Sequence, residues 1–296
     1  MKNKVNQSKI LLILSMIIYG SVGIFRKYTD VSSSELAFAR GVLGTLTILL
    51  VMLVTAKKPN KAAIKSNLIK LLISGALIGI NWMLLFESYN YTTVSVATLC
   101  YYMAPVFLML MAPIFLKEKL TLRKIICIVV ALLGIVLVSG IRPGETIGAN
   151  SLPGIIFGLL AALCYAIVLM INQKIKDIGS FDKTFVQLLA ASVILIPYIL
   201  VKGDRTLMSV GFASKEFWMV VIMGVLHTGV AYTLFFGAMK YLKAQSVAIL
   251  SYLDPICALI LSALILKERM DIYSIIGAVM ILGAAVLSEY IGSETT

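Results

Sequence analysis

One segment of this chain occurs twice, and the duplication limits the possible folds more than any other feature. Residues 91–138 align with residues 241–288 at a fixed offset of 150 positions, and the alignment needs no gap. The aligned pairs include Tyr91 with Tyr241, Tyr102 with Tyr252, Pro105 with Pro255, and Glu118 with Glu268. In a chain of 296 residues, such an offset indicates two structurally equivalent halves.

Composition indicates that both halves lie in a membrane. The chain is 60% hydrophobic and only 14% charged, whereas a soluble domain carries about 25% charged residues. It contains ten apolar runs, and a helix of about 20 apolar residues spans a hydrocarbon core of about 30 Å. We therefore predict an all-α membrane protein with ten transmembrane helices, at about 8–27, 35–55, 68–89, 94–116, 123–141, 152–174, 182–201, 215–239, 245–266 and 271–291.

The basic residues predict the orientation of these helices. Of the 26 Lys and Arg residues, 17 fall in the N-terminal segment or after an even-numbered helix, 8 fall on the opposite side, and Arg40 lies inside a helix. The positive-inside rule then places both termini in the cytoplasm, and we expect a multi-pass protein of the plasma (inner) membrane. The net charge of +12 is thus a topology signal, and we expect no nucleic-acid partner.

Five helices in each half is an odd number, so the second half enters the membrane from the opposite side. We predict two inverted five-helix repeats, over residues 8–141 and 152–291. Inverted repeats are common in secondary transporters, whose substrate site lies near the midplane where the repeats meet. The alternative interpretation is that duplication merely builds a stable bundle.

Other classes of function find less support in the sequence. All four cysteines lie inside apolar runs, and there is no nucleotide-binding motif, so we expect neither metal nor cofactor. One histidine and scattered acidic residues are a poor basis for an intramembrane enzyme, and we predict that the chain is not an enzyme. A receptor or assembly protein that binds a ligand without moving it stays a second alternative.

The ends of the two halves resemble a known family. Ala97–Pro105 leads to Lys117-Glu118-Lys119, Asp254-Pro255-Ile256 leads to Lys267-Glu268-Arg269, and Gly134 and Gly283 lie in the helices that follow. In these motifs the chain resembles the drug/metabolite transporter superfamily, as a ten-helix member with two EamA domains over about 10–141 and 152–290. Arg40 resembles an arginine usual in the second helix, and Asp254 stands where relatives carry an acidic residue, commonly glutamate. The resemblance implies export or exchange of small metabolites, often amino acids.

Two charged residues inside predicted helices are the principal candidates for a site. Asp254 lies about ten residues into its helix, where an unpaired carboxylate costs at least about 2.5 kcal/mol. It is a candidate for proton coupling or for binding a substrate ammonium group, and the alternative is a structural role beside Pro255. Arg40 is a candidate clamp for a substrate carboxylate, although it can also reach the interface or hold an acidic partner.

Aromatic, amide and histidine side chains within the runs complete the candidate set. Tyrosine and tryptophan would suit an apolar or aromatic amino acid or an amine, and buried amides need partners inside the bundle. The predicted substrate-binding residues are Tyr19, Arg40, Asn81, Trp82, Tyr102, Tyr165, Asn172, Gln187, His227 and Tyr252, with Asp254 as the coupling residue. Packing is the alternative for each. We expect a small-metabolite substrate, the lipid bilayer and possible protons as partners, and a monomer or homodimer.

A few further residues are expected to be structural. Glu118 and Glu268 are flanked by basic residues, and we expect neighbouring Lys or Arg side chains to pair with them. Asp271 is placed to cap the last helix. Closely spaced glycines, which include the Gly41/Gly44 and Gly75/Gly79 pairs, are expected to let helices approach each other.

Overall fold

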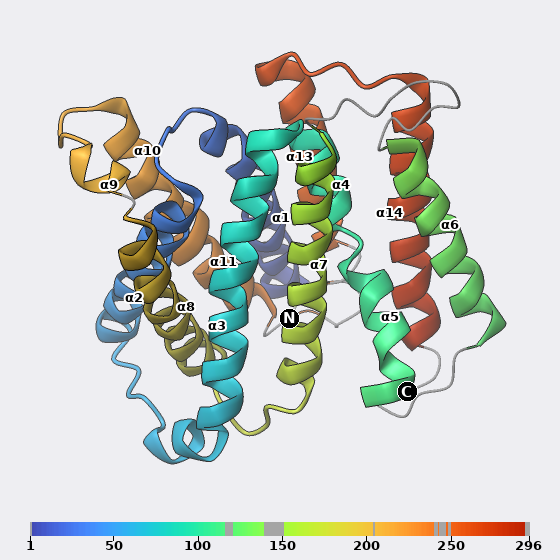
Figure 1. Cartoon of the computed structure of the whole chain (residues 1–296). Helices are drawn as coiled ribbons and strands as arrows, with labels where there is room; N and C mark the ends of the chain where they lie inside the picture. The colour runs from blue at the N-terminus through green and yellow to red at the C-terminus, as the bar shows by residue number, and fades with distance from the viewer. Residues whose placement is uncertain are drawn as a thin grey trace.

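The structure of the chain is a computed structural model, and it describes residues 2–115, 121–138, 151–203, 205–239, 242, 247 and 250–293. Within these ranges all regular secondary structure is helical, as Figure 1 shows. The predicted helices 94–116, 123–141 and 245–266 lie within these ranges in part. Lys117, Glu118 and Lys119 of the first motif lie outside the described residues.

The first half contains six helical segments. They are α1 (Lys2–Lys27), α2 (Ser33–Val54), α3 (Lys61–Tyr91), α4 (Val94–Tyr101), α5 (Ala104–Phe115) and α6 (Leu122–Val138). Side-chain caps fix the starts of α2 and α3, because Ser32 accepts from the Glu35 amide and Asn60 accepts from the Ala63 amide. The Asn60 cap explains why α3 begins at Lys61, well before the predicted residue 68.

The second half contains helices and two π-helical turns. It contains α7 (Leu152–Gln173), α8 (Ser180–Lys202), α9 (Thr206–Ser209), α10 (Lys215–Gly224), η1 (Val225–Val230), α11 (Ala231–Met239), α13 (Leu253–Leu261), η2 (Ser262–Leu266) and α14 (Ile272–Ser293). Gly203 ends α8 in the left-handed region at φ 72°. The run predicted at 215–239 is one continuous helical rod, because η1 joins α10 to α11 without interruption.

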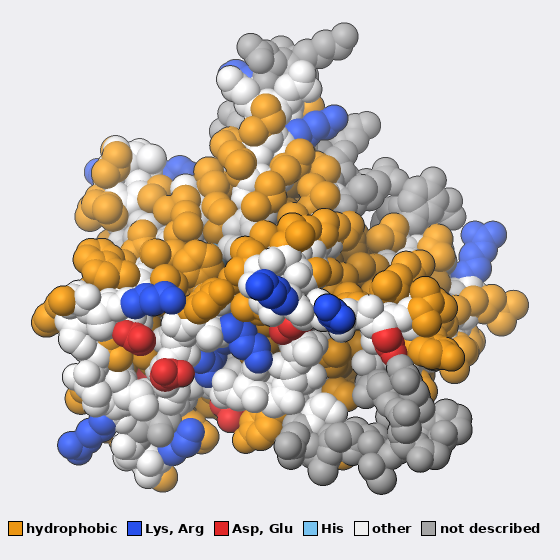
Figure 2. All heavy atoms as spheres, turned by 90° about the horizontal axis from the view of Figure 1, so that it is seen from above, with side chains coloured by type: hydrophobic (Ala, Val, Ile, Leu, Met, Phe, Trp, Pro, Cys, Tyr) orange, Lys and Arg blue, Asp and Glu red, His pale blue; other side chains and the backbone are white. Residues whose placement is uncertain are grey.

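The length and polarity of these helices make this a multi-pass membrane protein. Seven helices of the described ranges are long and apolar enough to cross a membrane, and three shorter apolar helices accompany them. Large apolar side chains such as Val54, Leu200 and Val201 are at least 75% exposed, which suits contact with lipid. Seen from above, most of the visible Lys, Arg, Asp and Glu side chains lie in the lower half of the view, and apolar side chains dominate the upper half (Figure 2).

The helix predicted at 94–116 is broken near its middle. It ends as α4 at Tyr101 and resumes as α5 at Ala104. Pro105 accounts for the break, because its ring collides with the carbonyl four residues earlier, at Tyr101, and it has no amide hydrogen to donate. In the second copy, Tyr252 interrupts the helix immediately before α13, three residues before Pro255.

Specific contacts give the relative directions of the helices. Asn81 contacts Ala161 and Ser88 contacts Gly154, so α3 and α7 run antiparallel. In contrast, Gly75 lies against Gln187 and Gly79 against Ala191, so α3 and α8 run parallel. Helices α2 and α8 run antiparallel, because Gly41 lies against Ser192 and Gly44 against Leu188.

The last helices of the two halves, α6 and α14, pack on each other at one edge of the molecule (Figure 1). Gly134 contacts Gly277 and Ile281, while Val138 contacts Gly277. The pair is antiparallel, because the later residue Val138 of α6 contacts the earlier residue Gly277 of α14, whereas Gly134 also reaches Ile281. The glycine that the family motif singled out, Gly283, has no atom within 4 Å of the position a Cβ would take. Gly277 therefore provides the close approach.

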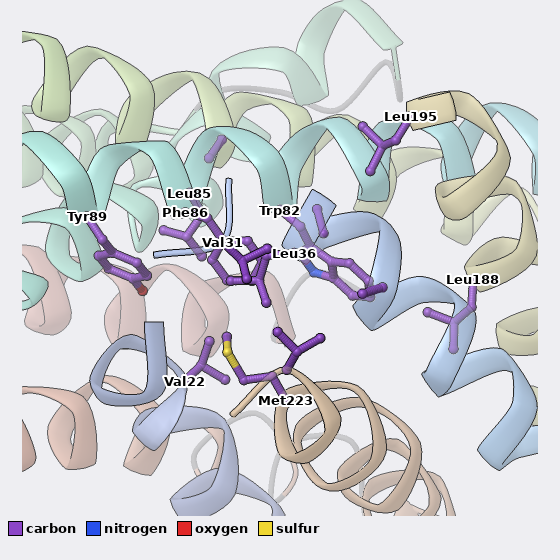
Figure 3. Packing of buried hydrophobic residues seen from close by; sticks show 14 of the residues in the cluster. Val22, Val31, Leu36, Trp82, Leu85, Phe86, Tyr89, Leu188, Leu195 and Met223 are labelled. Atoms are coloured by element: carbon purple, nitrogen blue, oxygen red, sulfur yellow. The ribbon is translucent and has the colours of Figure 1, made fainter. Parts of the chain in front are cut away.

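The largest core cluster lies between α1, α2, α3, α8 and α10. Figure 3 shows Trp82, Phe86 and Tyr89 directed from α3 toward Val22 of α1 and Met223 of α10. Phe86 and Met223 are fully buried. This cluster fixes the side of α3 that carries Trp82, and Trp82 in turn borders the buried charge described below.

Candidate functional site

Arg40 is a buried charge in the middle of the bundle. Its side chain, on α2, is 5% exposed. Its Nε donates to the Thr228 hydroxyl of η1 at 2.8 Å, and its guanidinium carbon lies 4.5 Å from the centre of the Trp82 ring and 5.5 Å from that of Phe86. Among the residues that the structure describes, no carboxylate forms an ion pair with Arg40. The guanidinium therefore keeps donors for another anion.

The π-helical turn η1 positions the partner of Arg40. The Thr228 hydroxyl accepts from Arg40 and donates to the Met223 carbonyl, five residues earlier, at 3.1 Å. Gly44 of α2 lies directly against Thr228, so a side chain at position 44 would separate the two helices. Single π-helical turns inside α-helices are frequent at functional sites. Here the wider π-helical turn η1 brings Thr228 to Arg40.

Asp254 is the second charged group of the centre. It lies in the first turn of α13, and the Tyr102 side chain lies next to its carboxylate. Asp254 is partly buried. Arg40 is close enough for its charge to act on Asp254. A carboxylate and a guanidinium therefore face one region from opposite halves of the chain.

Tyrosine rings surround these two charges. The Tyr19 ring lies 5.6 Å from that of Tyr232, and the Tyr101 ring lies 5.6 Å from that of Tyr165 and 6.0 Å from that of Tyr102. The Tyr19 hydroxyl is buried and has no hydrogen-bond partner in the described part of the chain. Both Arg40 and Asp254 act on it electrostatically, so a polar group lies near the two charges.

The structure thus brings six of the predicted residues into one region. These are Tyr19, Arg40, Trp82, Tyr102, Tyr165 and Asp254. Tyr252 is buried at the helix interruption just before Asp254. Two members of the region were not predicted, namely Thr228 and Tyr232. The available signal was a hydroxyl-bearing side chain in the middle of an apolar run, which for Thr228 lies beside the predicted His227.

His227 lies in η1 next to Thr228 but makes a separate set of contacts. It is fully buried, its Nε2 lies 2.8 Å from the Ser21 hydroxyl, and its Nδ1 lies 3.3 Å from the Ile222 carbonyl oxygen. The Phe25 ring packs edge-on at 4.7 Å. These contacts describe a hydrogen-bonded packing residue between α1 and η1, and a role in substrate binding stays a prediction.

The three predicted amides join helices. Asn81 donates to the Ala161 carbonyl at 2.6 Å and thereby ties α3 to α7, and it lies close to the Tyr101 side chain. Gln187 of α8 donates to Ser74 of α3 at 2.7 Å and to Asn172 of α7 at 2.8 Å. Only Asn81 therefore reaches the region around Asp254 through a described contact. For Asn172 and Gln187 substrate binding stays a prediction.

The expectation that basic neighbours pair with Glu268 is wrong. Its carboxylate instead accepts from the backbone amides of Val94, at 2.9 Å, and Ser95, at 3.2 Å. The start of α4 offers two amide donors with no partner inside their helix, and these outcompete flexible lysine and arginine side chains. Asp271 does cap α14, because it accepts from the Ser274 amide at 2.8 Å. No group of three or more His, Cys, Asp or Glu side chains in the described ranges could hold a metal ion.

Fold and site together define a helical membrane protein with charged and aromatic side chains gathered at its centre. Comparison with known proteins gives the family. The model of the EamA-like transporter family matches residues 7–140 and 152–290. This chain belongs to the EamA-like transporter family.

Individual relatives agree with the family match. The chain is 32% identical over 280 residues to the "Uncharacterized transporter YxxF" of Bacillus subtilis (strain 168), covering 94% of this chain and 88% of that protein. It is 28% identical over 279 residues to an "Uncharacterized transporter" of Archaeoglobus fulgidus, covering 94% of each. A crystal structure with 16% sequence identity has a TM-score of 0.63 and covers 98% of this chain and 99% of its own, which shows a shared fold.

Proposed function

We propose that this protein is a secondary transporter of small zwitterionic metabolites, amino acids foremost and related amines beside them, and that it works by alternating access. The observation that carries the proposal is the pair Arg40 and Asp254. The two opposite charges face one region deep in the bundle, and neither is neutralised by an ion pair among the described residues.

A zwitterion satisfies both charges at once. A buried guanidinium without an anion is costly, and Arg40 would bind a substrate carboxylate with the donors that Thr228 leaves free. Asp254 would accept the substrate ammonium group beside the Tyr102 hydroxyl. Tyr19, Trp82, Tyr101 and Tyr165 would cover the rest of the ligand, and aromatic faces favour both cations and apolar side chains.

Alternating access follows from two inverted halves, which we infer from the helix directions. The equivalent helices α2 and α8 run antiparallel, as do α6 and α14. Helix α3 is antiparallel to α7, which stands first in its half. Contacts also recur in pairs, because α3 packs on α7 in the way that α11 packs on α1. This pattern supports ten spans in two repeats of opposite orientation.

The excess of basic residues on one side supports an orientation with both termini in the cytoplasm. On that assignment, the end of α1, the α3–α4 turn and Glu268 face outward from the plasma membrane. Exported or exchanged metabolites would then cross the membrane through the region around Arg40 and Asp254. We propose a proton or substrate gradient as the driving force, with Asp254 as the group that would carry the proton.

Counterflow in proteoliposomes tests the proposal. Vesicles preloaded with an unlabelled amino acid are expected to accumulate the same labelled amino acid, and Asp254→Asn vesicles are expected to lose this exchange. A panel of amino acids and amines, first screened by thermal stabilisation of the purified protein, provides the substrates. Specific binding without any exchange would contradict transport and favour a receptor.

A further inference from the structure

Helix α4 connects two polar clusters that lie at different depths. At its beginning, the amides of Val94 and Ser95 bond Glu268, and at its end Tyr101 and Tyr102 lie beside Asp254. The helix has eight residues and is therefore about 12 Å long. It contacts α13, and Figure 1 shows the two in the same part of the bundle.

The second half makes the same connection in the opposite direction. Helix α13 begins at Leu253, next to Asp254, and continues through η2 to Ser262 and Glu268. Lys267, in the left-handed region at φ 56°, turns the chain so that the Glu268 amide bonds the Ser262 carbonyl at 3.3 Å. Two short antiparallel helical segments, one from each half, thus run from the candidate site to Glu268.

Four residues join these segments at the far end, and we name this cluster the outer clasp. Glu268 accepts from the Val94 amide, the Ser95 amide and the Ser95 hydroxyl, the last at 3.3 Å, and also from the Ser262 hydroxyl. The hydroxyl oxygens of Ser95 and Ser262 lie 3.0 Å apart. Val94, Ser95, Ser262 and Glu268 therefore tie the first half to the second.

The outer clasp completes the N-terminus of α4. Thr93 satisfies the other free amides, because its hydroxyl accepts from the Val96 amide at 3.1 Å and its carbonyl from the Ala97 amide at 3.0 Å. The remaining two donors depend on Glu268, which also gains from the positive end of the helix dipole. Without Glu268 these two amides would need water.

Helix α1 ends beside the outer clasp. The Lys27 ammonium group donates to the carbonyl oxygens of Tyr89 and Thr92, at the end of α3, and its charge acts on Glu268. Arg26 donates to the Asn90 side chain at 2.8 Å. The turn between α3 and α4 is therefore held from two sides, by basic residues of α1 and by Glu268.

We propose that α4 and α13–η2 form a gate, that the outer clasp holds it shut, and that Glu268 is the residue whose release opens the path to the candidate site. The proposal rests on the transport function proposed above. The interruption between Tyr101 and Ala104 is the hinge, because α4 can tilt there without breaking bonds of α5. Since Tyr102, at the end of α4, lies next to Asp254, a ligand or proton at Asp254 acts on one end of the moving helix.

Accessibility of a cysteine within the gate tests this proposal without any substrate. Thr98, buried in α4 between the outer clasp and the site, is replaced by cysteine in a chain whose four native cysteines are alanine. A membrane-impermeant maleimide is added to intact cells and, separately, to inverted vesicles. We expect Glu268→Gln to raise the labelling rate about tenfold from one side of the membrane, the effect of losing one charge-assisted hydrogen bond.

Two variants complete the series. Ser262→Ala removes one hydroxyl from the outer clasp and is expected to give a smaller increase. Glu216→Gln, a carboxylate in the first turn of α10, is the matched control and is expected to leave labelling unchanged. Folding is checked by size-exclusion chromatography. If Glu268→Gln does not fold, the labelling rate of Ser262→Ala tests the gate instead. Equal labelling of the clasp variants and the control from both sides would overturn the gate, whatever the counterflow assay shows.

Discussion

Replacement of Arg40 separates function from stability most sharply. Arg40 is buried, and its described interactions are one hydrogen bond to Thr228 and contacts with the Trp82 and Phe86 rings. If its free donors serve a substrate, Arg40→Lys keeps the charge and loses the planar fork that binds a carboxylate with two bonds. Arg40→Met removes the charge and keeps much of the length.

The magnitude of the stability effect follows from these contacts. A hydrogen bond from a charged donor contributes about 1.5–3 kcal/mol, and a cation over an aromatic ring about 0.5–2 kcal/mol. Against them stands about 2.5–3.5 kcal/mol for a charge at the centre of a membrane helix. The terms nearly cancel, so Arg40→Met should change the free energy of unfolding by no more than about 2 kcal/mol.

The transport effect should be much larger. Losing one charge-assisted bond to the substrate carboxylate, about 1.5–3 kcal/mol, lowers kcat/KM for Arg40→Lys by about 10-fold to 150-fold. Proteoliposome uptake and thermal unfolding in detergent measure the two effects, and Arg205→Lys, at the exposed start of α9, is the control. Normal uptake by Arg40→Lys would refute the carboxylate clamp. Strong destabilisation by Arg40→Met would show that the arginine is structural.

Three further predictions concern packing, pH and helix contacts. Gly79→Ala would place a methyl group 2.4 Å from the Ala191 carbonyl oxygen and should cost about 1–3 kcal/mol of stability. The control Gly283→Ala, which has open space at the new methyl group, should not destabilise the protein. Equal melting temperatures of the two variants would contradict the α3–α8 packing. Asp254→Asn cannot exchange a proton, so any residual uptake should lose its dependence on external pH, and an unchanged pH profile would exclude Asp254 as the coupling group. Gln187→Leu leaves Ser74 and Asn172 without their donor and should cost about 1–3 kcal/mol of stability with KM unchanged; a raised KM at normal stability would instead place Gln187 in the site.

Much of the fold could be predicted because apolar length and charge are properties of the sequence alone. The spans at 35–55, 152–174, 182–201 and 215–239 lie within a few residues of α2, α7, α8 and the α10–η1–α11 rod. The interruption at Tyr102 was not predicted, although Pro105 was noted, because a proline is tolerated in many membrane helices. The early start of α3 depends on the Asn60 cap, which hydrophobicity does not report.

The site could be predicted only in part for a related reason. Buried charges such as Arg40 and Asp254 stand out because they are rare inside apolar runs. Thr228 and Tyr232 are ordinary residues in such runs, and only the π-helical turn and the packing of α1 on α11 bring them to the centre. The Glu268 contact joins residues 173 and 174 positions apart, and local sequence suggested basic neighbours instead.

The most direct measurement of the central claim compares an amino acid substrate with two analogues, its carboxamide and its N-acetyl derivative. Binding is measured by isothermal titration calorimetry on the wild type, Arg40→Met and Asp254→Asn. If Arg40 binds the carboxylate and Asp254 the ammonium group, the preference over the carboxamide disappears only in Arg40→Met, and the preference over the N-acetyl derivative disappears only in Asp254→Asn. Both preferences persisting in both variants would contradict the account.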